Sequence, residues 1–368
     1  MVYSLVSQSE RNVFYVRTIG RLLLSAIFLV LTVLLVLAAK YAPALVFSFY
    51  PELSRKLLSA ISSVTRAIPL AVWELLAGLA VLWLLYTFVR IFTQRRSFLC
   101  WLAGIVLSVC VGLFLFVALW GLNHFGPTVG EQLGLSVREY TKQELTDATR
   151  YYAAQVNALA DDVSRDDQGL AQLSSFETLS QQAGAGYDKL AERYELFTGS
   201  HDPVKKLATW RMFSQFGITG IFVCFTGEAC VNPDTYEVWL PFTMCHELAH
   251  RQTVAAEDGA NFCAYLACME NESPEFRYSG AIAAYVYCHN ALYKADKTAA
   301  TEIWGSLKEG VRADIQAANT HYAQYEGKVQ DAATKVNDTY LKAFSEEAGV
   351  QSYGEAADLL IAWYLEKK

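Results

Sequence analysis

The sequence lacks the patterns that mark several common classes of protein. Its eight cysteines include no C-x-x-C pair, so a zinc site built from cysteines is not expected. Most cysteines of the C-terminal part sit on apolar faces, which favours buried free thiols over disulfides. The net charge is -7 at pH 7 and the C-terminal part has no basic patch, which argues against nucleic acid as a partner. No internal repeat or low-complexity tract is present.

Charged residues are almost missing from three long segments near the N-terminus. Residues 22–39 and 97–125 contain none, and residues 67–89 contain only Glu74. Each segment is long enough to cross a hydrocarbon core of about 30 Å as a helix. We therefore expect residues 1–125 to form a multi-pass anchor in the lipid bilayer of the cell membrane. The expected transmembrane helices cover about residues 22–39, 67–91 and 98–122.

Basic residues predict the orientation of this anchor. The short link from Arg90 to Arg96 is the most basic turn, and positively charged loops favour the cytoplasm. The N-terminal segment agrees, because it carries Arg11, Arg17 and Arg21. The C-terminal domain would then be extracytoplasmic, although the loop between the first two predicted helices is also basic. Glu74 stands close to Pro69 and is expected at the level of the lipid headgroups rather than in an ion pathway.

Residues 126–368 are more polar and long enough for one soluble domain with a substantial core. Residues 220–225 are rich in β-forming residues, and residues 228–232 follow a Thr226-Gly227 turn as a second short strand. The first strand either pairs with an extended peptide beside a cleft or covers one end of a helical core. The predicted fold is mainly α, a predominantly helical domain with a small β-hairpin behind three N-terminal transmembrane helices. Helices are expected at about 141–163, 176–197, 203–217, 260–270, 276–295, 299–317, 324–347 and 355–366.

The segment His246-Glu247-Leu248-Ala249-His250 has the pattern H-E-x-x-H. On a helix, residues four apart lie on the same face, so both imidazoles can reach one Zn²⁺. Glu247 follows the first of these ligands, where its carboxylate can take a proton from a metal-activated water. A chance occurrence on an amphipathic helix is the alternative, but the chain has only six histidines. The motif predicts Zn²⁺ as cofactor, His246 and His250 as metal ligands, and Glu247 as the catalytic residue.

A catalytic zinc needs a third protein ligand and one open position. Glu257 and Asp258 follow His250 by seven and eight residues and open the next predicted helix. Both are also acids that a helix dipole favours in the first turn, so the pattern does not choose between them. Three further side chains are candidates for stabilising an oxyanion: Arg277, Tyr278 and His289.

Several segments together carry a wider resemblance: residues 68–75, 120–123, 217–222, 225–229, 246–250, 257–262, 278–280, 337–342 and 349–354. With these segments the chain resembles a family of uncharacterised bacterial membrane proteins, the domain of unknown function 3810. The resemblance covers nearly the whole chain. It implies a zincin-like peptidase domain behind membrane helices, in a family without a settled activity.

One position departs from that family. Its members usually have Glu-Asp-Glu-Ala-Asn-Phe where residues 257–262 of this chain have Gly259 in place of the second glutamate. That glutamate is similar in context to the third ligand of other H-E-x-x-H peptidases, so Glu257 or Asp258 would have to replace it. The predicted function is a membrane-anchored zinc metallopeptidase that hydrolyses peptide or protein substrates. The alternative is a catalytically inactive zincin-like membrane sensor or scaffold.

Overall fold

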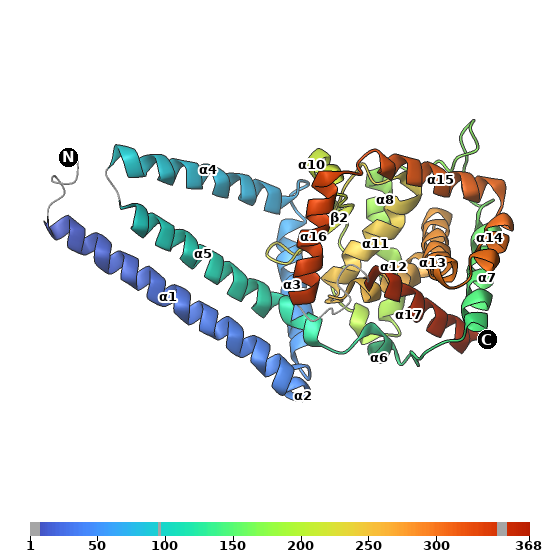
Figure 1. The fold of residues 1–368 in the computed structure, drawn as a ribbon, viewed down its shortest axis with the longest axis horizontal. Helices are drawn as coiled ribbons and strands as arrows, with labels where there is room; N and C mark the ends of the chain where they lie inside the picture. The colour runs from blue at the N-terminus through green and yellow to red at the C-terminus, as the bar shows by residue number, and fades with distance from the viewer. Residues whose placement is uncertain (1–7, 95–96, 344–351) are drawn as a thin grey trace.

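Three long helices at the N-terminus form a slender bundle that projects from a larger helical body (Figure 1). The computed structural model describes residues 8–94, 97–343 and 352–368. All three helices are long and apolar enough to cross a membrane, as the uncharged segments predicted. They are α1 (Gln8–Tyr41), α4 (Val72–Thr93) and α5 (Phe98–Leu119). The predicted basic link between α4 and α5 includes Arg95 and Arg96, which lie outside the described residues.

Two further helices connect α1 to α4, where the sequence was interpreted only as a loop. They are α2 (Pro43–Val46) and α3 (Tyr50–Thr65). Figure 1 shows α3 running across the ends of the long helices, between them and the body. The Ser54 hydroxyl of α3 donates to the Leu119 carbonyl at 2.6 Å, so α3 is fixed to the end of α5.

The body is mainly helical, with α11, α12 and α13 at its centre and α7 and α17 packed against them. These helices are α7 (Lys142–Leu159), α11 (Leu240–Arg251), α12 (Glu257–Glu270), α13 (Pro274–Ala295) and α17 (Ser352–Lys367). The other helices of the described residues in this part are η1 (Gly121–Phe125), α6 (Val129–Leu133), α8 (Phe176–Gln182), α9 (Ala185–Ala191), η2 (Glu195–Phe197), α10 (Trp210–Gln215), η3 (Glu237–Trp239), α14 (Lys297–Gly305), α15 (Glu309–Ala323) and α16 (Lys328–Ala343). Thr141 and Glu144 form the capping box that was predicted to begin α7. All eight cysteines are free.

Three helices expected from the sequence are shorter or interrupted in the structure. The expected helix 176–197 is divided into α8, α9 and η2, and the expected helix 299–317 is divided into α14 and α15. Gly184 stands at the first break, where an added Cβ would lie 2.4 Å from the His201 carbonyl oxygen. The expected helix 203–217 is replaced by a short strand followed by α10. The last part of the expected helix 324–347, beyond residue 343, lies outside the described residues.

A three-stranded sheet lies against α11. Its strands are β1 (Lys205–Lys206), β2 (Gly220–Val223) and β3 (Glu228–Val231). β2 and β3 form the antiparallel hairpin that the sequence predicted, with Gly220 opposite Val231. The sequence reasoning missed β1, which pairs parallel to β3. The order β1-β3-β2 buries β3 and leaves β2 half-buried at the edge of the sheet.

The buried Glu228 of β3 holds the first turn of α4. Its carboxylate accepts the backbone N–H groups of Val72 and Trp73, each at 2.9 Å. The same carboxylate forms an ion pair with Lys205 at 2.6 Å. The first N–H groups of a helix have no partner within the helix, and a carboxylate there satisfies them and interacts favourably with the helix dipole. This arrangement joins the sheet to the start of a membrane-type helix.

Glu74 makes the reverse connection, from α4 to the body. Its carboxylate accepts the backbone N–H groups of Ala208 and Thr209 at 2.8 and 2.9 Å, just before α10. The sequence analysis predicted only its level in the membrane and did not address a protein partner. The structure gives it a specific one, so the junction of α4 with the body is fixed from both sides.

Candidate metal centre

Two histidines and one glutamate meet between α11 and α12. His246 and His250 lie one turn apart on α11, and their Nε2 atoms are 3.1 Å apart. Glu257 opens α12, and its carboxylate oxygens lie 3.3 Å from His246 Nε2 and 3.8 Å from His250 Nε2. Ligand atoms around one tetrahedral zinc lie about 3.3 Å apart, because zinc–ligand bonds measure about 2.0–2.1 Å. The three side chains are therefore close enough to hold one metal ion.

The turn between α11 and α12 carries Glu257 back toward the histidines. Thr253 in this turn has φ 73°, a left-handed conformation that is rare for a β-branched residue. Its backbone N–H donates to the His250 carbonyl at 3.0 Å, and its hydroxyl accepts from Arg55 of α3 at 3.4 Å. Such a conformation persists only where the surroundings hold it, and it is frequent at functional sites.

Asp258 and Gly259 follow Glu257 in the sequence but do not belong to the cluster. Among the described residues, the group of potential ligands contains Glu257 and not Asp258. A Cβ added at Gly259 would lie 2.7 Å from Val129 Cγ2 and 3.2 Å from Val254 Cγ1. Position 259 therefore points toward α6 and the preceding turn. A glycine there removes no ligand from this cluster.

Both histidines are oriented through their second ring nitrogen. His246 Nδ1 lies 2.9 Å from Asn261 Oδ1, and His250 Nδ1 lies 2.7 Å from the Val254 carbonyl oxygen. Because these oxygens only accept hydrogen bonds, the neutral form of each imidazole has its proton on Nδ1 and directs its Nε2 lone pair to the cluster. The sequence reasoning missed both partners. Asn261 follows Glu257 by four residues, and this one-turn spacing was the signal that could have identified it.

Glu247 lies beside the cluster, against the start of β2. The residue is 4% exposed, and its Oε2 has no hydrogen-bond partner within the described residues. A Cβ added at Gly220 would lie 2.4 Å from Glu247 Oε1, so only glycine allows this close approach. Burial raises the pKa of Glu247 to about 8. The strand and the carboxylate thus form one wall of the site.

The two histidines differ in their preference for a proton. Burial lowers the pKa of His250 to about 4, and the neighbouring His246 adds to this decrease. Burial also acts to lower the pKa of His246, but the hydrogen bond and charge of Glu257 outweigh it, so that pKa is raised. Neutral imidazole is the form that binds metal, and His250 is held in that form by its buried position.

Trp120, which follows α5, contacts the metal helix directly. Its indole N–H donates to the His250 carbonyl at 3.1 Å, and its ring centroid lies 5.9 Å from that of His250. Trp120 is buried together with Leu58 of α3 and Ala255 of the turn after α11. The end of a membrane-type helix is therefore part of the surroundings of the metal centre.

The three candidates for an oxyanion donor lie on α13. The Tyr278 hydroxyl donates to Asp314 at 2.5 Å and accepts from Arg165 at 3.2 Å, so it belongs to a buried hydrogen-bond network. The His289 ring packs among aromatic side chains of α13 and α14. Arg277 Nε is buried without a hydrogen-bond partner within the described residues. The cluster of His246, His250 and Glu257 includes none of these three.

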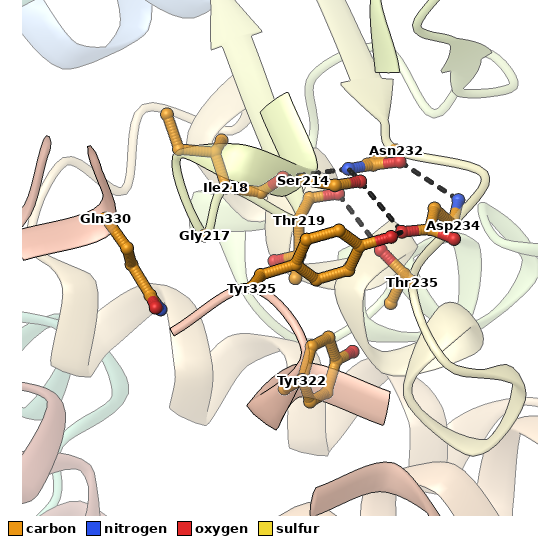
Figure 2. Close-up of a pocket in the computed structure, with 10 residues that line it drawn as sticks. All are labelled: Ser214, Gly217, Ile218, Thr219, Asn232, Asp234, Thr235, Tyr322, Tyr325 and Gln330. Carbon is orange, nitrogen blue, oxygen red and sulfur yellow. Dashed lines mark hydrogen bonds between the residues drawn. The ribbon is translucent and has the colours of Figure 1, made fainter. Parts of the chain in front are cut away.

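A cavity of about 250 Å³ opens at the N-terminal end of β2 (Figure 2). Thr219 lines it and directly precedes Gly220, the residue that contacts the catalytic-base candidate. Asp234 also lines the cavity and accepts hydrogen bonds from Ser214 Oγ at 2.8 Å and from the Tyr325 hydroxyl at 2.6 Å. The lining of this cavity includes no residue of the metal cluster, and Thr219 connects the two through its neighbour Gly220 in the chain.

Comparison with known families identifies the chain but not its chemistry. The model of the family described as "Protein of unknown function (DUF3810)" matches residues 48–361. The chain belongs to this family, as the resemblance predicted. No curated protein and no solved structure matches it.

Proposed function

We propose that this member of the DUF3810 family is a membrane-anchored, zinc-dependent metallopeptidase that hydrolyses peptide or protein substrates. His246, His250 and Glu257 would hold the Zn²⁺, and Glu247 would be the catalytic base. The proposal depends above all on three ligand atoms that converge at separations of 3.1 to 3.8 Å. These distances fit the edges of a zinc tetrahedron. The hydrogen bonds at both Nδ1 atoms add support, because they aim the free lone pairs at one point.

Zn²⁺ at this position would act as a Lewis acid on the scissile carbonyl and acidify the attacking water. Glu247 would take a proton from that water and deliver it to the leaving nitrogen, so that one water is consumed and the carboxylate is regenerated. Its buried position and unpaired Oε2 support this role, because the free oxygen is available to a substrate or water.

β2 offers a means of positioning a peptide. The strand lies at the edge of the sheet and pairs with β3 on one side. An extended peptide that adds to a free strand edge gains backbone hydrogen bonds whatever its sequence. Because Gly220 of β2 touches Glu247, a peptide paired with this edge would pass close to the base. The cavity beside Thr219 would then accept one of its side chains.

The anchor would be a multi-pass assembly in the lipid bilayer, with the catalytic domain extracytoplasmic. The three apolar helices support the first part. The orientation rests on the basic link between the last two helices. A reporter fused after Lys368 tests it, since alkaline phosphatase is active only outside the cytoplasm. Phosphatase activity is expected, and a silent fusion beside an active cytoplasmic reporter would reverse the orientation.

The alternative function is a catalytically inactive membrane sensor or scaffold. Its sequence argument was Gly259, and that argument is weakened because position 259 points toward Val129. The two functions differ in one measurable property. A sensor would bind zinc without cleaving peptide bonds.

Elemental analysis of the full chain in detergent tests the metal site. We expect about one zinc per chain after loading, lost in Glu257→Ala and retained in Asp258→Ala. The second variant is a matched control, because it removes a neighbouring acid that lies outside the ligand cluster. No zinc in the wild-type chain would refute the proposal.

Cleavage of a mixed pool of quenched fluorescent peptides tests the chemistry. The zinc-loaded wild-type chain should cleave some of them, and Glu247→Gln with equal zinc content should not. If zinc is bound but both chains are equally inactive over this pool and over membrane-protein substrates, the sensor hypothesis replaces the peptidase.

A further inference from the structure

One side of α3 exposes a stripe of large apolar side chains. Leu53 is 46% exposed, Leu57 is 40% exposed and Val64 is 73% exposed, and Phe49, just before the helix, is 51% exposed. The spacings of four, four and seven residues place them on one face of a helix. Single exposed apolar residues are normal on a protein surface, but a continuous stripe marks a surface that something covers.

The other two sides of α3 have different chemistry. The side toward the rest of the protein is buried and consists of Tyr50, Ser54, Arg55, Leu58 and Ser62. The remaining exposed side is polar, with an ion pair between Glu52 and Lys56 and with Ser63 about two turns further along. The helix is therefore divided lengthwise into a buried, an apolar exposed and a charged exposed face.

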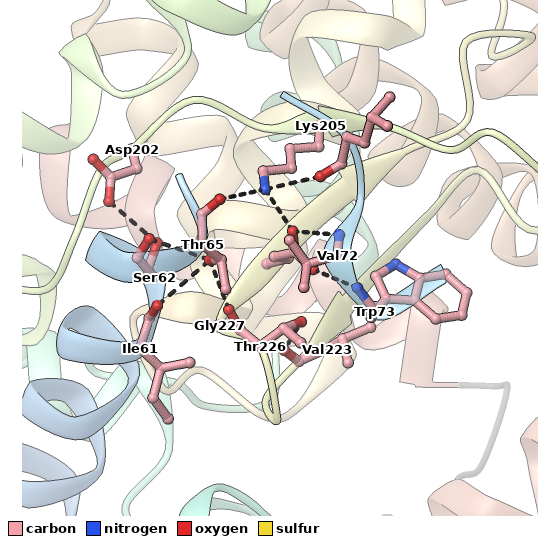
Figure 3. Close-up of polar contacts among 12 residues, drawn as sticks. Ile61, Ser62, Thr65, Val72, Trp73, Asp202, Lys205, Val223, Thr226 and Gly227 are labelled. Carbon is pink, nitrogen blue, oxygen red and sulfur yellow. Dashed lines mark hydrogen bonds and ion pairs between the residues drawn. The ribbon is translucent and has the colours of Figure 1, made fainter. Parts of the chain in front are cut away.

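Hydrogen bonds on the buried side of α3 determine the direction in which the apolar stripe points. The Tyr50 hydroxyl donates to the Val117 carbonyl at 3.2 Å near the end of α5. At the other end of the helix, the Thr65 hydroxyl donates to the Thr226 carbonyl of the sheet at 2.9 Å (Figure 3). With both ends attached, α3 cannot rotate to bury the stripe against the body.

We propose that α3 lies flat in the interface of the bilayer, with this stripe directed toward the acyl chains and the Glu52–Lys56 side toward the headgroups. Continuity with the membrane-type helices favours lipid over a protein partner. The chain enters α3 four residues after α2 and leaves it for α4. Leu45 of α2 is also exposed, as are Ile68 and Leu70 in the link to α4. A helix with one apolar and one charged face that runs across the ends of spanning helices has the pattern of an interfacial helix.

The position of α3 would also set the height of the metal centre. Leu58 packs with Trp120, which bonds the metal helix, and Arg55 contacts the turn that carries Glu257 into place. The opposite side of the same helix would touch lipid, and a helix is about 10 Å wide. If the proposed peptidase function holds, its substrates are polypeptide segments next to the bilayer, such as the juxtamembrane segments of anchored proteins.

Quenching by lipid-borne spin labels tests the proposal on the full chain in lipid nanodiscs. An environment-sensitive fluorophore is attached in the variants Leu53→Cys and Leu57→Cys, with Ser63→Cys as the matched control on the polar face. Leu82→Cys in α4 reports a spanning helix, because Leu82 is 64% exposed there. The wild-type chain, whose cysteines are buried or half-buried, gives the labelling background.

We expect a lipid with a spin label near the top of its acyl chain to quench positions 53 and 57 at least three times as strongly as position 63. Strong quenching at Leu82 with weak quenching at all three α3 positions would overturn the proposal and leave the spans intact. Protection of positions 53 and 57 from aqueous iodide without lipid quenching would also overturn it, because a protein would then cover the stripe. Zinc content does not enter this experiment, so its failure is distinct from failure of the peptidase proposal.

Discussion

Two buried polar clusters in the body differ in how completely their hydrogen bonds are satisfied. In the first, Asp314 accepts from the Tyr278 hydroxyl at 2.5 Å and from Arg165 at 3.1 Å, and Tyr278 also accepts from Arg165. In the metal centre, Glu247 Oε2 and Asn261 Nδ2 are buried without a partner within the described residues. Both clusters join helices of the same core, so burial alone does not distinguish them.

The difference supports a structural role for the first cluster and the proposed function for the second. A buried polar group without a partner costs about 1–3 kcal/mol, and native proteins have few of them. In the Asp314 cluster, partners from the chain itself satisfy the buried polar groups, as a cluster that stabilises helix packing requires. In the metal centre, two buried atoms beside the potential ligands, Glu247 Oε2 and Asn261 Nδ2, have no partner within the described residues. In the proposed function, the water or substrate at the metal would complete this centre.

The largest expected effect is that of Glu247→Gln on hydrolysis. Removal of a catalytic base lowers the rate by at least about 100-fold. The thermal midpoint of the full chain in detergent should change little near pH 7, because burial raises the pKa of Glu247 to about 8 and a neutral carboxyl is then replaced by a neutral amide of the same size. Rates, zinc content and thermal unfolding are measured together. A variant that loses stability instead of activity would give Glu247 the same kind of role as Asp314.

Asp314→Ala should show the opposite pattern. It leaves the buried Tyr278 hydroxyl without its acceptor and removes one of several acceptors of the half-buried Arg165 guanidinium, and breaking such a pair costs about 3 kcal/mol. Zinc content per folded chain should not change. Thermal unfolding is the measurement, and Glu302→Ala is the control, because its ion pair with Arg150 is largely exposed and contributes less than about 1 kcal/mol. Equal midpoints for the two variants would contradict the structural role.

Gly220→Ala tests the wall between β2 and the metal centre. Its new Cβ would meet the Glu247 carboxylate at 2.4 Å, so that carboxylate must move. We expect at least a ten-fold loss of hydrolysis and about 1–2 kcal/mol of destabilisation by overpacking, with zinc retained. Gly305→Ala is the matched control, because nothing lies within 4 Å of its added Cβ. That variant should be as active as wild type and slightly more stable, as is usual when alanine replaces glycine in a helix.

Local signals predicted much of the architecture and part of the site. The three uncharged segments became the three membrane-type helices, and the capping box at Thr141 begins a helix. The histidine spacing was sufficient to place two potential ligands on one face of α11. Each of these features depends on residues close together in the sequence, which is why the sequence was informative.

Contacts between distant residues could not be predicted in this way. The Trp120–His250 hydrogen bond joins residues 130 apart, and the choice of Glu257 over Asp258 as a member of the cluster depends on the turn at Thr253. No spacing rule encodes either. The amphipathic helix α3 was different, because its apolar positions Leu53 and Leu57 are four residues apart and the signal was present. It was overlooked because the segment was considered only as a loop between spans.

The smallest expected effect belongs to a polar cluster outside both buried ones. Glu144 in the capping box of α7 is half-buried at the surface, and its hydrogen bonds to Arg138 and to the Thr141 backbone lower its pKa to about 2. Because the carboxyl pKa is depressed in the folded state, its stabilising contribution is complete above about pH 4.5 and is lost as the pH falls toward 2. Thermal midpoints of wild type and Glu144→Gln should therefore differ slightly at pH 6 and converge near pH 2.5. A difference that persists or grows in acid would mean that the Glu144→Gln variant loses hydrogen bonds as well as the charge. The geometry of the hydrogen bonds in this helix cap would then contribute to stability, as it does in the buried Asp314 cluster.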